Sequence, residues 1–176
     1  MKPSEKTFCV AFTGHRPEKI SGYSRKPAEV EQTIRRAAAA EISSLAAEGA
    51  MEFLCGMAPG FDIWCGEEVL NLRRNGAIPP ETKLTAVIPY RGFELSFAEE
   101  AWRRRYTYLM NGADSAVFLA EEYSAGCFNV RNDYLVERSE LLVAYFEGYA
   151  GGTAYTVRRA LSKGGKVINL FQKMLF

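Results

Sequence analysis

The chain has 176 residues, 48% of them hydrophobic, 12% aromatic and 24% charged, and its formal net charge at pH 7 is +1. A chain of this length buries roughly 70% of the surface that its unfolded form exposes, so we expect residues 1–176 to form a single domain. The aromatic content and a mean hydropathy of −0.15 supply the apolar area that disordered chains lack, which argues against an intrinsically disordered protein. The near-zero net charge argues against nucleic acid as a partner bound through a basic face, although it leaves room for a local basic patch.

Short apolar runs alternate with longer amphipathic stretches along the chain. Pro27 and Gly49 flank the first amphipathic stretch, and Gly76 ends the second, as expected of helix boundaries. In chain order the pattern predicts a strand at 8–12, a helix at 27–48, a strand at 52–55, a helix at 61–75, a strand at 83–88, a helix at 97–110, a strand at 115–119, a helix at 129–138, a strand at 141–146, a helix at 152–162 and a strand at 166–170.

The strands are continuously apolar, as in the run Leu-Leu-Val-Ala-Tyr at 141–145. Such strands, alternating with helices, indicate a parallel sheet that is covered on both faces. We therefore predict an α/β fold, a Rossmann-like three-layer sandwich with a mainly parallel central sheet. Loops that follow parallel strands meet at the carboxyl edge of the sheet, where ligands bind. We expect the longest irregular stretches, 13–26 and 120–128, to carry function.

The loop after the first strand contains Thr-Gly-His-Arg-Pro at 13–17. Gly14 permits close approach of the backbone to a ligand, and Arg16 supplies a planar cation suited to phosphate or carboxylate. His15 is either a proton donor or a residue that caps or packs.

The loop after the second strand leads directly into a helix and contains Gly56 and Gly60. Both glycines permit close backbone approach, and the helix N-terminus offers free amides to an anion. Asp62 either caps this helix or contacts a ribose hydroxyl, whereas Glu67 is expected to be a surface acid.

The third unusual loop, at 147–153, precedes the last long predicted helix. Gly151 and Gly152 leave backbone amides uncovered, and Thr153 adds a hydroxyl in the first helical turn. This combination predicts a phosphate-binding loop; the alternative is a tight turn with a threonine cap.

Other chemistries lack a sequence basis. Neither GxGxxG nor GxxxxGK[ST] occurs, and the four cysteines form no CxxC pair and are accompanied by a single histidine. We therefore expect no metal, no cofactor and reduced thiols in the cytoplasm. No apolar run approaches the ~20 residues of a membrane span, and residues 1–6 are too polar for a signal peptide. The run Arg103-Arg104-Arg105 is expected to form a solvated helix face.

Taken together, the loops resemble those of the SLOG superfamily, specifically its YpsA-like branch. The similarity covers most of the chain, and its members share a Rossmann-like fold and bind nucleotides or nucleotide-derived ligands. The residues that carry the resemblance are Phe-Thr-Gly-His-Arg-Pro at 12–17, Gly-Met-Ala at 56–58 with Gly60 and 62–67, Ile-Pro-Tyr at 88–90, Arg-Asn at 131–132, Val-Glu-Arg-Ser at 136–139, and Gly-Gly-Thr at 151–153 with Thr156 and Val157.

The resemblance also extends to the LOG phosphoribohydrolases, whose motif PGGxGTxxE ends in a glutamate credited with catalysis. Aligned on Gly152 and Thr153, that motif places Thr156 where the glutamate should be, which argues against glycosidic hydrolysis. DNA-processing protein A, another relative, binds single-stranded DNA, for which the near-neutral charge gives no support.

We therefore predict that the chain binds a nucleotide or nucleotide-derived ligand, either a nucleoside phosphate or an ADP-ribose-like molecule. Asn132 would contact a base or sugar edge through its amide. One alternative is a nucleotide N-glycosidase that uses Asp62 or Glu67 in place of the missing glutamate, and another is an interaction protein. The resemblance, with the aromatic residues Phe171 and Phe176 near the C-terminal end, also suggests a homo-oligomer.

Overall fold

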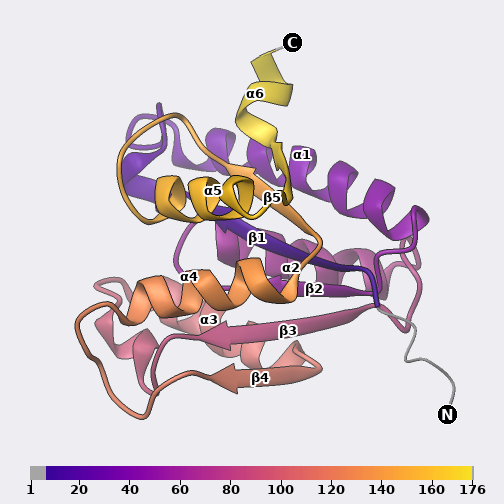
Figure 1. The fold of residues 1–176 in the computed structure, drawn as a ribbon. Helices are drawn as coiled ribbons and strands as arrows, with labels where there is room; N and C mark the ends of the chain where they lie inside the picture. Colours follow the sequence, from indigo (N-terminus) through magenta and orange to yellow (C-terminus); the bar gives the residue numbers. More distant parts are fainter. Residues whose placement is uncertain (1–6, 176) are drawn as a thin grey trace, which may run out of the picture.

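The computed structural model describes residues 7–175, which form one six-stranded parallel sheet and the helices around it (Figure 1). The strands lie in the order β4-β3-β2-β1-β5-β6. The elements are β1 (Cys9–Gly14), η1 (Pro17–Lys19), α1 (Pro27–Ala47), β2 (Glu52–Cys55), α2 (Phe61–Arg74), β3 (Lys83–Ile88), η2 (Phe93–Ser96), α3 (Glu100–Gly112), β4 (Ser115–Phe118), α4 (Cys127–Arg138), β5 (Leu141–Tyr145), α5 (Gly152–Ser162), β6 (Lys166–Asn169) and α6 (Leu170–Leu175).

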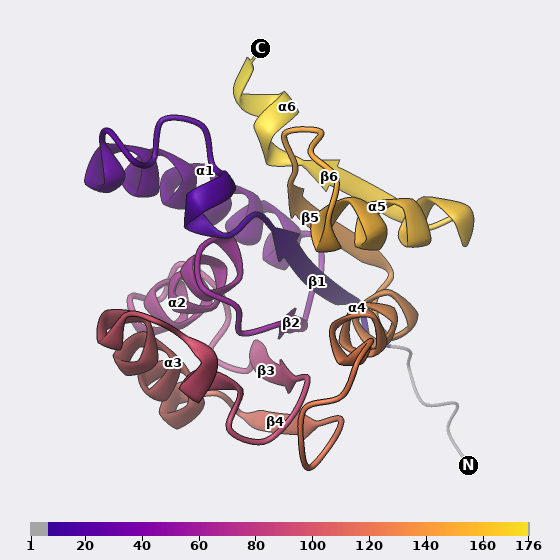
Figure 2. The ribbon, with the colours of Figure 1, turned by 90° about the vertical axis from the view of Figure 1, so that its left-hand side faces the viewer.

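The sheet lies between two helical layers, with α1, α2 and α3 on one face and α4 and α5 on the other (Figure 2). Side chains alternate between the faces, so Val10 and Phe12 pack under the three-helix layer while Ala11 packs under the other. Phe12 stacks on Phe53 with ring centroids 5.6 Å apart. The predicted Rossmann-like α/β sandwich is confirmed, and its sheet is parallel throughout.

Three short helices, η1, η2 and α6, were not predicted from the sequence. The last strand ends at Asn169, whose Oδ1 accepts hydrogen bonds from the amides of Phe146 and Phe171, and the chain turns directly into α6. Phe171 then packs edge-on against Tyr145 at 5.7 Å instead of standing free for a partner. Phe176 and residues 1–6 lie outside the described residues, and homo-oligomerisation stays a prediction.

The chain reverses its direction of travel across the sheet at β1. From β1 it proceeds through β2 and β3 to β4, then returns to the other side of β1 as β5. The carboxyl ends of β1 and β5 lie side by side, with Gly14 paired to Tyr145. The loops that leave these two strands diverge to opposite faces, which opens a crevice between them. Within residues 7–175, no helix is both long and apolar enough to cross a membrane.

Candidate functional site

A cavity of about 340 Å³ opens at this crevice. Four segments far apart in the sequence form its wall: the β1–η1 region, the start of α2, the first turns of α4, and the loop between β5 and α5. The volume lies in the range typical of small-molecule sites. The lining residues are Thr13, Gly14, His15, Arg16, Lys19, Ala58, Asp62, Phe128, Asn129, Arg131, Asn132, Ala150, Gly151, Gly152 and Thr153.

Most of the predicted site residues lie on this wall, namely Gly14, His15, Arg16, Asp62, Gly151, Gly152 and Thr153 from the three loops, and Asn132 from α4. Three predicted residues, Gly56, Gly60 and Glu67, are not among the lining residues. The sequence argument did not select several others, of which Lys19 and Arg131 carry charge and Phe128 carries an aromatic ring.

The N-terminus of α5 borders the cavity and carries no side-chain cap from residues 7–175. Gly151 immediately precedes the helix with φ +141°, a conformation that favours glycine. Its carbonyl accepts the Tyr155 amide at 3.0 Å, which begins the helical hydrogen-bond pattern. The amides of the first turn have no acceptor within the helix, so they and the helix dipole offer a binding site for an anion.

Arg131, on α4, places a buried guanidinium against the cavity. Its Nη1 donates to the Gly56 carbonyl, and its Nε donates to Asn132 Oδ1 at 2.8 Å. Among the described residues, no carboxylate lies within ion-pair distance of Arg131, and burial lowers its pKa. A buried cation without a contacting anion is costly, so this arrangement favours an anionic ligand.

The hydrogen bond from Arg131 also fixes the orientation of the Asn132 amide. Because Asn132 Oδ1 accepts this bond, the Nδ2 group remains to donate. Asn132 Nδ2 lies 3.6 Å from the position that a Cβ on Gly152 would take. The amide donor therefore faces the first turn of α5, where an anion would also meet the backbone amides.

Two further cations line the cavity from the β1–η1 region. Arg16 and Lys19 come from the residues around η1, and the Lys19 Nζ lies 3.0 Å from the position of a Cβ on Gly151. With Arg131 they give three basic residues against one acid, Asp62, among the lining residues. The wall is therefore positively charged even though the whole chain is nearly neutral.

Asp62 lies in the first turn of α2 with 5% of its surface exposed. Burial raises its pKa from 3.8 to about 6, against the opposing effects of the Arg131 charge and the backbone amide of Ala58. Its Oδ1 accepts no hydrogen bond from the part of the chain that the structure describes. Asp62 is therefore a buried carboxyl at the wall of the cavity whose pKa is raised to about 6.

His15 is neutral in this structure. Its Nε2 accepts the Glu147 backbone amide at 3.0 Å, so the proton of the neutral ring is on Nδ1. Burial lowers the pKa of the imidazole, and 2% of the residue is exposed. These contacts favour a packed, hydrogen-bonded His15 over a charged proton donor. The same hydrogen bond ties the loop after β1 to the loop after β5.

Gly56 and Gly60 support the wall from behind. A Cβ on Gly56 would lie 2.7 Å from Arg131 Nη1, and a Cβ on Gly60 would lie 2.7 Å from the His15 carbonyl. Gly60 also has φ +94°, which favours glycine. Both glycines therefore serve close packing between neighbouring loops, which sequence alone does not distinguish from contact with a ligand.

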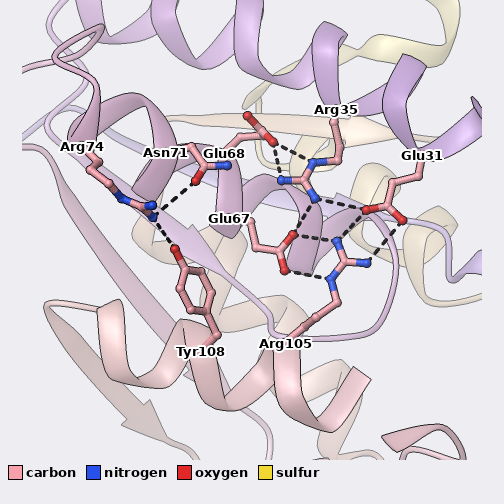
Figure 3. Close-up of polar contacts among 8 residues, drawn as sticks. All are labelled: Glu31, Arg35, Glu67, Glu68, Asn71, Arg74, Arg105 and Tyr108. Carbon is pink, nitrogen blue, oxygen red and sulfur yellow. Dashed lines mark hydrogen bonds and ion pairs between the residues drawn. The ribbon is translucent and has the colours of Figure 1, made fainter. Parts of the chain in front are cut away.

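Glu67 is not a surface acid, and that expectation was wrong. The residue is 7% exposed and accepts hydrogen bonds from Arg35 at 2.8 Å and from Arg105 at 2.6 and 2.8 Å, within a network that joins α1, α2 and α3 (Figure 3). Glu31 bridges the same two arginines. The expected solvated face at 103–105 is likewise wrong for Arg105, which is half-buried in these contacts.

Residues 7–175 contain no group of three or more histidine, cysteine or acidic side chains able to hold a metal ion.

Comparison with known proteins identifies the family. The YpsA model, described as the YspA SLOG family, matches residues 10–170. The chain belongs to this SLOG family. Among its curated relatives, a UPF0398 protein of Halalkalibacterium halodurans is 27% identical over 149 residues, which cover 83% of this chain and 76% of the relative. A UPF0398 protein of Bacillus thuringiensis is 24% identical over 158 residues, which cover 88% and 83%.

Solved structures share the fold at low sequence identity. DNA processing protein A of Streptococcus pneumoniae superposes with a TM-score of 0.60 and 19% identity, over 92% of this SLOG chain and 50% of the pneumococcal chain. This chain thus spans half the length of that protein. DNA processing protein A of Helicobacter pylori superposes with a TM-score of 0.59 and 18% identity, over 97% and 72% of the two chains.

One expectation is corrected by these structures. Nucleic acid was expected not to be a partner, on the ground of a net charge of +1. The Helicobacter pylori protein, which has the same fold, is described by a unique single-stranded DNA binding mode. The physical reason for the error is that net charge averages over the whole surface, whereas Arg16, Lys19 and Arg131 concentrate positive charge at one cavity.

Proposed function

We propose that this SLOG chain binds the phosphate group of a nucleotide or nucleotide-derived ligand in the cavity at the carboxyl edge of its sheet. One observation carries the proposal: three basic residues and the uncapped N-terminus of α5 line a cavity that holds a single acid. A phosphate would accept hydrogen bonds from the backbone amides at Gly152 and Thr153 and from Asn132 Nδ2. Arg16 and Lys19 would balance its charge.

Asp62 would face the sugar of the ligand. It is the one acid among the residues that line the cavity, and a carboxylate is a hydrogen-bond acceptor suited to a ribose hydroxyl.

Single-stranded DNA is the second candidate, because the fold is shared with the Helicobacter pylori protein described by its single-stranded DNA binding mode. A phosphate at the end of a strand presents the same chemistry to the α5 amides as a free nucleotide does. The two candidates therefore differ in whether further nucleotides follow the bound one. They also differ in how strongly the Kd depends on salt concentration, because this dependence is steep for a strand whose phosphates contact many basic residues.

A binding screen tests the proposal. Nucleoside monophosphates, ADP-ribose, ribose 5-phosphate and a 5′-phosphorylated oligonucleotide are compared with adenosine, which lacks the phosphate. A ligand at 100 times its Kd stabilises the fold by about 2.7 kcal/mol, which raises the Tm of a chain of this size by roughly 5–11 °C. We expect such a rise for phosphorylated ligands and a small one for adenosine. The absence of any rise with every phosphorylated ligand would refute the proposal.

A further inference from the structure

An aromatic surface begins in the wall of the cavity and continues into solvent. Phe128, in the first turn of α4, is a lining residue, and its ring centroid lies 6.4 Å from that of Tyr123. Tyr123 is 62% exposed. Tyr90 lies edge-on to both rings, 5.6 Å from Tyr123 and 6.4 Å from Phe128. The phosphate site described above makes no use of these rings.

The rings are held in place from behind. Tyr90 is 9% exposed and Phe93 is fully buried, and the Phe93 ring lies 5.8 Å from Phe128. Phe128 is therefore supported by core residues on one side while it borders the cavity on another. A fixed aromatic ring at the wall of a polar cavity contacts a flat ligand group at little cost in side-chain entropy.

The charges beside the rings are of the opposite sign to those around α5. Glu121 and Glu122 are exposed next to Tyr123, although Arg91 pairs with Glu121 at 2.9 Å. Figures 1 and 2 both place the loop before α4 on the β3–β4 side of the sheet edge, and η1 and the loop before α5 on the β5 side. Phosphate is therefore favoured on the β5 side, and an uncharged ring is favoured on the β3–β4 side.

We propose that Phe128 and Tyr123 form a subsite that stacks the base of a nucleotide whose phosphate lies at the N-terminus of α5. The base belongs either to a free nucleotide or to the terminal nucleotide of a single strand, and the two sources share the same stacking chemistry. Stacking accepts every base, because each has a π face. This inference rests on the proposed function and assigns the part of the ligand that phosphate binding leaves open.

Titration calorimetry on two variants tests the subsite. Tyr123→Ala removes an exposed ring, and Phe128→Leu removes a ring while keeping most of its packing volume. Tyr108→Ala is the matched control, because Tyr108 is 43% exposed and lies on α3, outside the cavity. Each protein is titrated with AMP, with ribose 5-phosphate, which has no base, and with a 5′-phosphorylated oligoadenylate.

We expect both test variants to weaken AMP roughly 5- to 100-fold, as loss of a stacked base does, and to change the Kd of ribose 5-phosphate less than twofold. Tyr108→Ala should leave both values unchanged. A loss confined to the oligonucleotide would support the subsite and identify a strand end as the source of the base. An unchanged affinity for AMP and oligonucleotide, or an equal loss for AMP and ribose 5-phosphate, would overturn the subsite.

The wild-type protein separates this inference from the proposed function. If ribose 5-phosphate bound as tightly as AMP and as the oligonucleotide, the base subsite would be wrong while phosphate binding would stand. If none of the three ligands bound, both proposals would fall.

Discussion

Gly152→Val separates ligand binding from folding at the N-terminus of α5. A Cβ on Gly152 would meet Asn132 Nδ2 at 3.6 Å, which is an ordinary contact, and the residue has no left-handed φ. Valine is compatible with the first helical turn, so we expect a change in unfolding free energy within about 1 kcal/mol and a Tm within roughly 4 °C of wild type. Gly151 does not offer this test, because its φ of +141° strains any other residue.

The valine methyl groups would occupy the space where a phosphate meets the helix. Loss of one hydrogen bond to a charged group costs about 1.5–3 kcal/mol, which corresponds to a roughly 10- to 150-fold rise in Kd. Calorimetry with AMP or ribose 5-phosphate measures this rise, and circular dichroism checks the fold. Ala28→Val, a matched change in the exposed first turn of α1, should bind as wild type does. Wild-type affinity in Gly152→Val would refute the placement of the phosphate.

Two further predictions concern buried acids. Because the pKa of Asp62 rises from 3.8 to about 6 on folding, the folded state holds this proton more tightly, and the unfolding free energy of the wild type falls between about pH 4 and pH 6. Asp62→Asn lacks this proton, so its unfolding free energy should increase by about 3 kcal/mol relative to wild type between pH 4 and pH 7, as measured by denaturant titrations. A difference between the two proteins that does not change with pH would contradict the pKa shift. Glu67→Gln should lower the unfolding free energy by about 2–4 kcal/mol, because it removes the carboxylate that pairs with Arg35 and Arg105. The Kd of a phosphorylated ligand should not change. Glu100→Gln, which removes an exposed ion pair, is the matched control and should lower the unfolding free energy by less than about 1 kcal/mol.

The fold was predictable because its signals are local. Each strand is an apolar run, and prolines and glycines mark most helix boundaries, so the bounds of β2 and β3 coincide with the prediction. The short helices were missed because they give no such local signal. Helix α6 has six residues, too few to show a helical period, and it is held by Asn169 and by packing of Phe171 on Tyr145. Such tertiary contacts leave no pattern within the segment itself.

The site was predictable where glycine marks a loop, and less so where a charge acts through a distant partner. Gly151 and Gly152 stand beside the cavity as expected from their place before a helix. Arg131 lies in the second turn of α4, lines the cavity, and donates from Nη1 to the carbonyl of Gly56, 75 positions away. Glu67 is a second example, because its hydrogen-bond partner Arg105 is 38 positions away and the pairing buries an acid that was expected at the surface. Sequence spacing does not encode either pairing.

Hydrolysis of the N-glycosidic bond depends on an acid-base group close to the sugar and base. In the LOG motif that this SLOG chain resembles, the glutamate for this work follows the phosphate-binding threonine by one turn. Thr156 occupies that position here, is fully buried, and donates its hydroxyl to the Gly152 carbonyl at 2.8 Å within α5. It neither lines the cavity nor carries a charge, so it supplies none of the glutamate's function.

We therefore predict that AMP incubated with the protein releases adenine no faster than AMP alone, since a positioned acid-base group contributes typically 10²- to 10⁴-fold. Asp62 is the one acid among the lining residues, and with a pKa of about 6 it is partly protonated near that pH. If Asp62 served as the proton donor, release would fall as pH rises above 6, because the donor loses its proton. Chromatography of free adenine at pH 5, 6 and 8 distinguishes the absence of hydrolysis from hydrolysis in which Asp62 donates the proton. Base release that exceeds the blank and disappears in Asp62→Asn would replace binding with an N-glycosidase activity centred on that carboxyl, while release that survives the substitution would contradict both assignments.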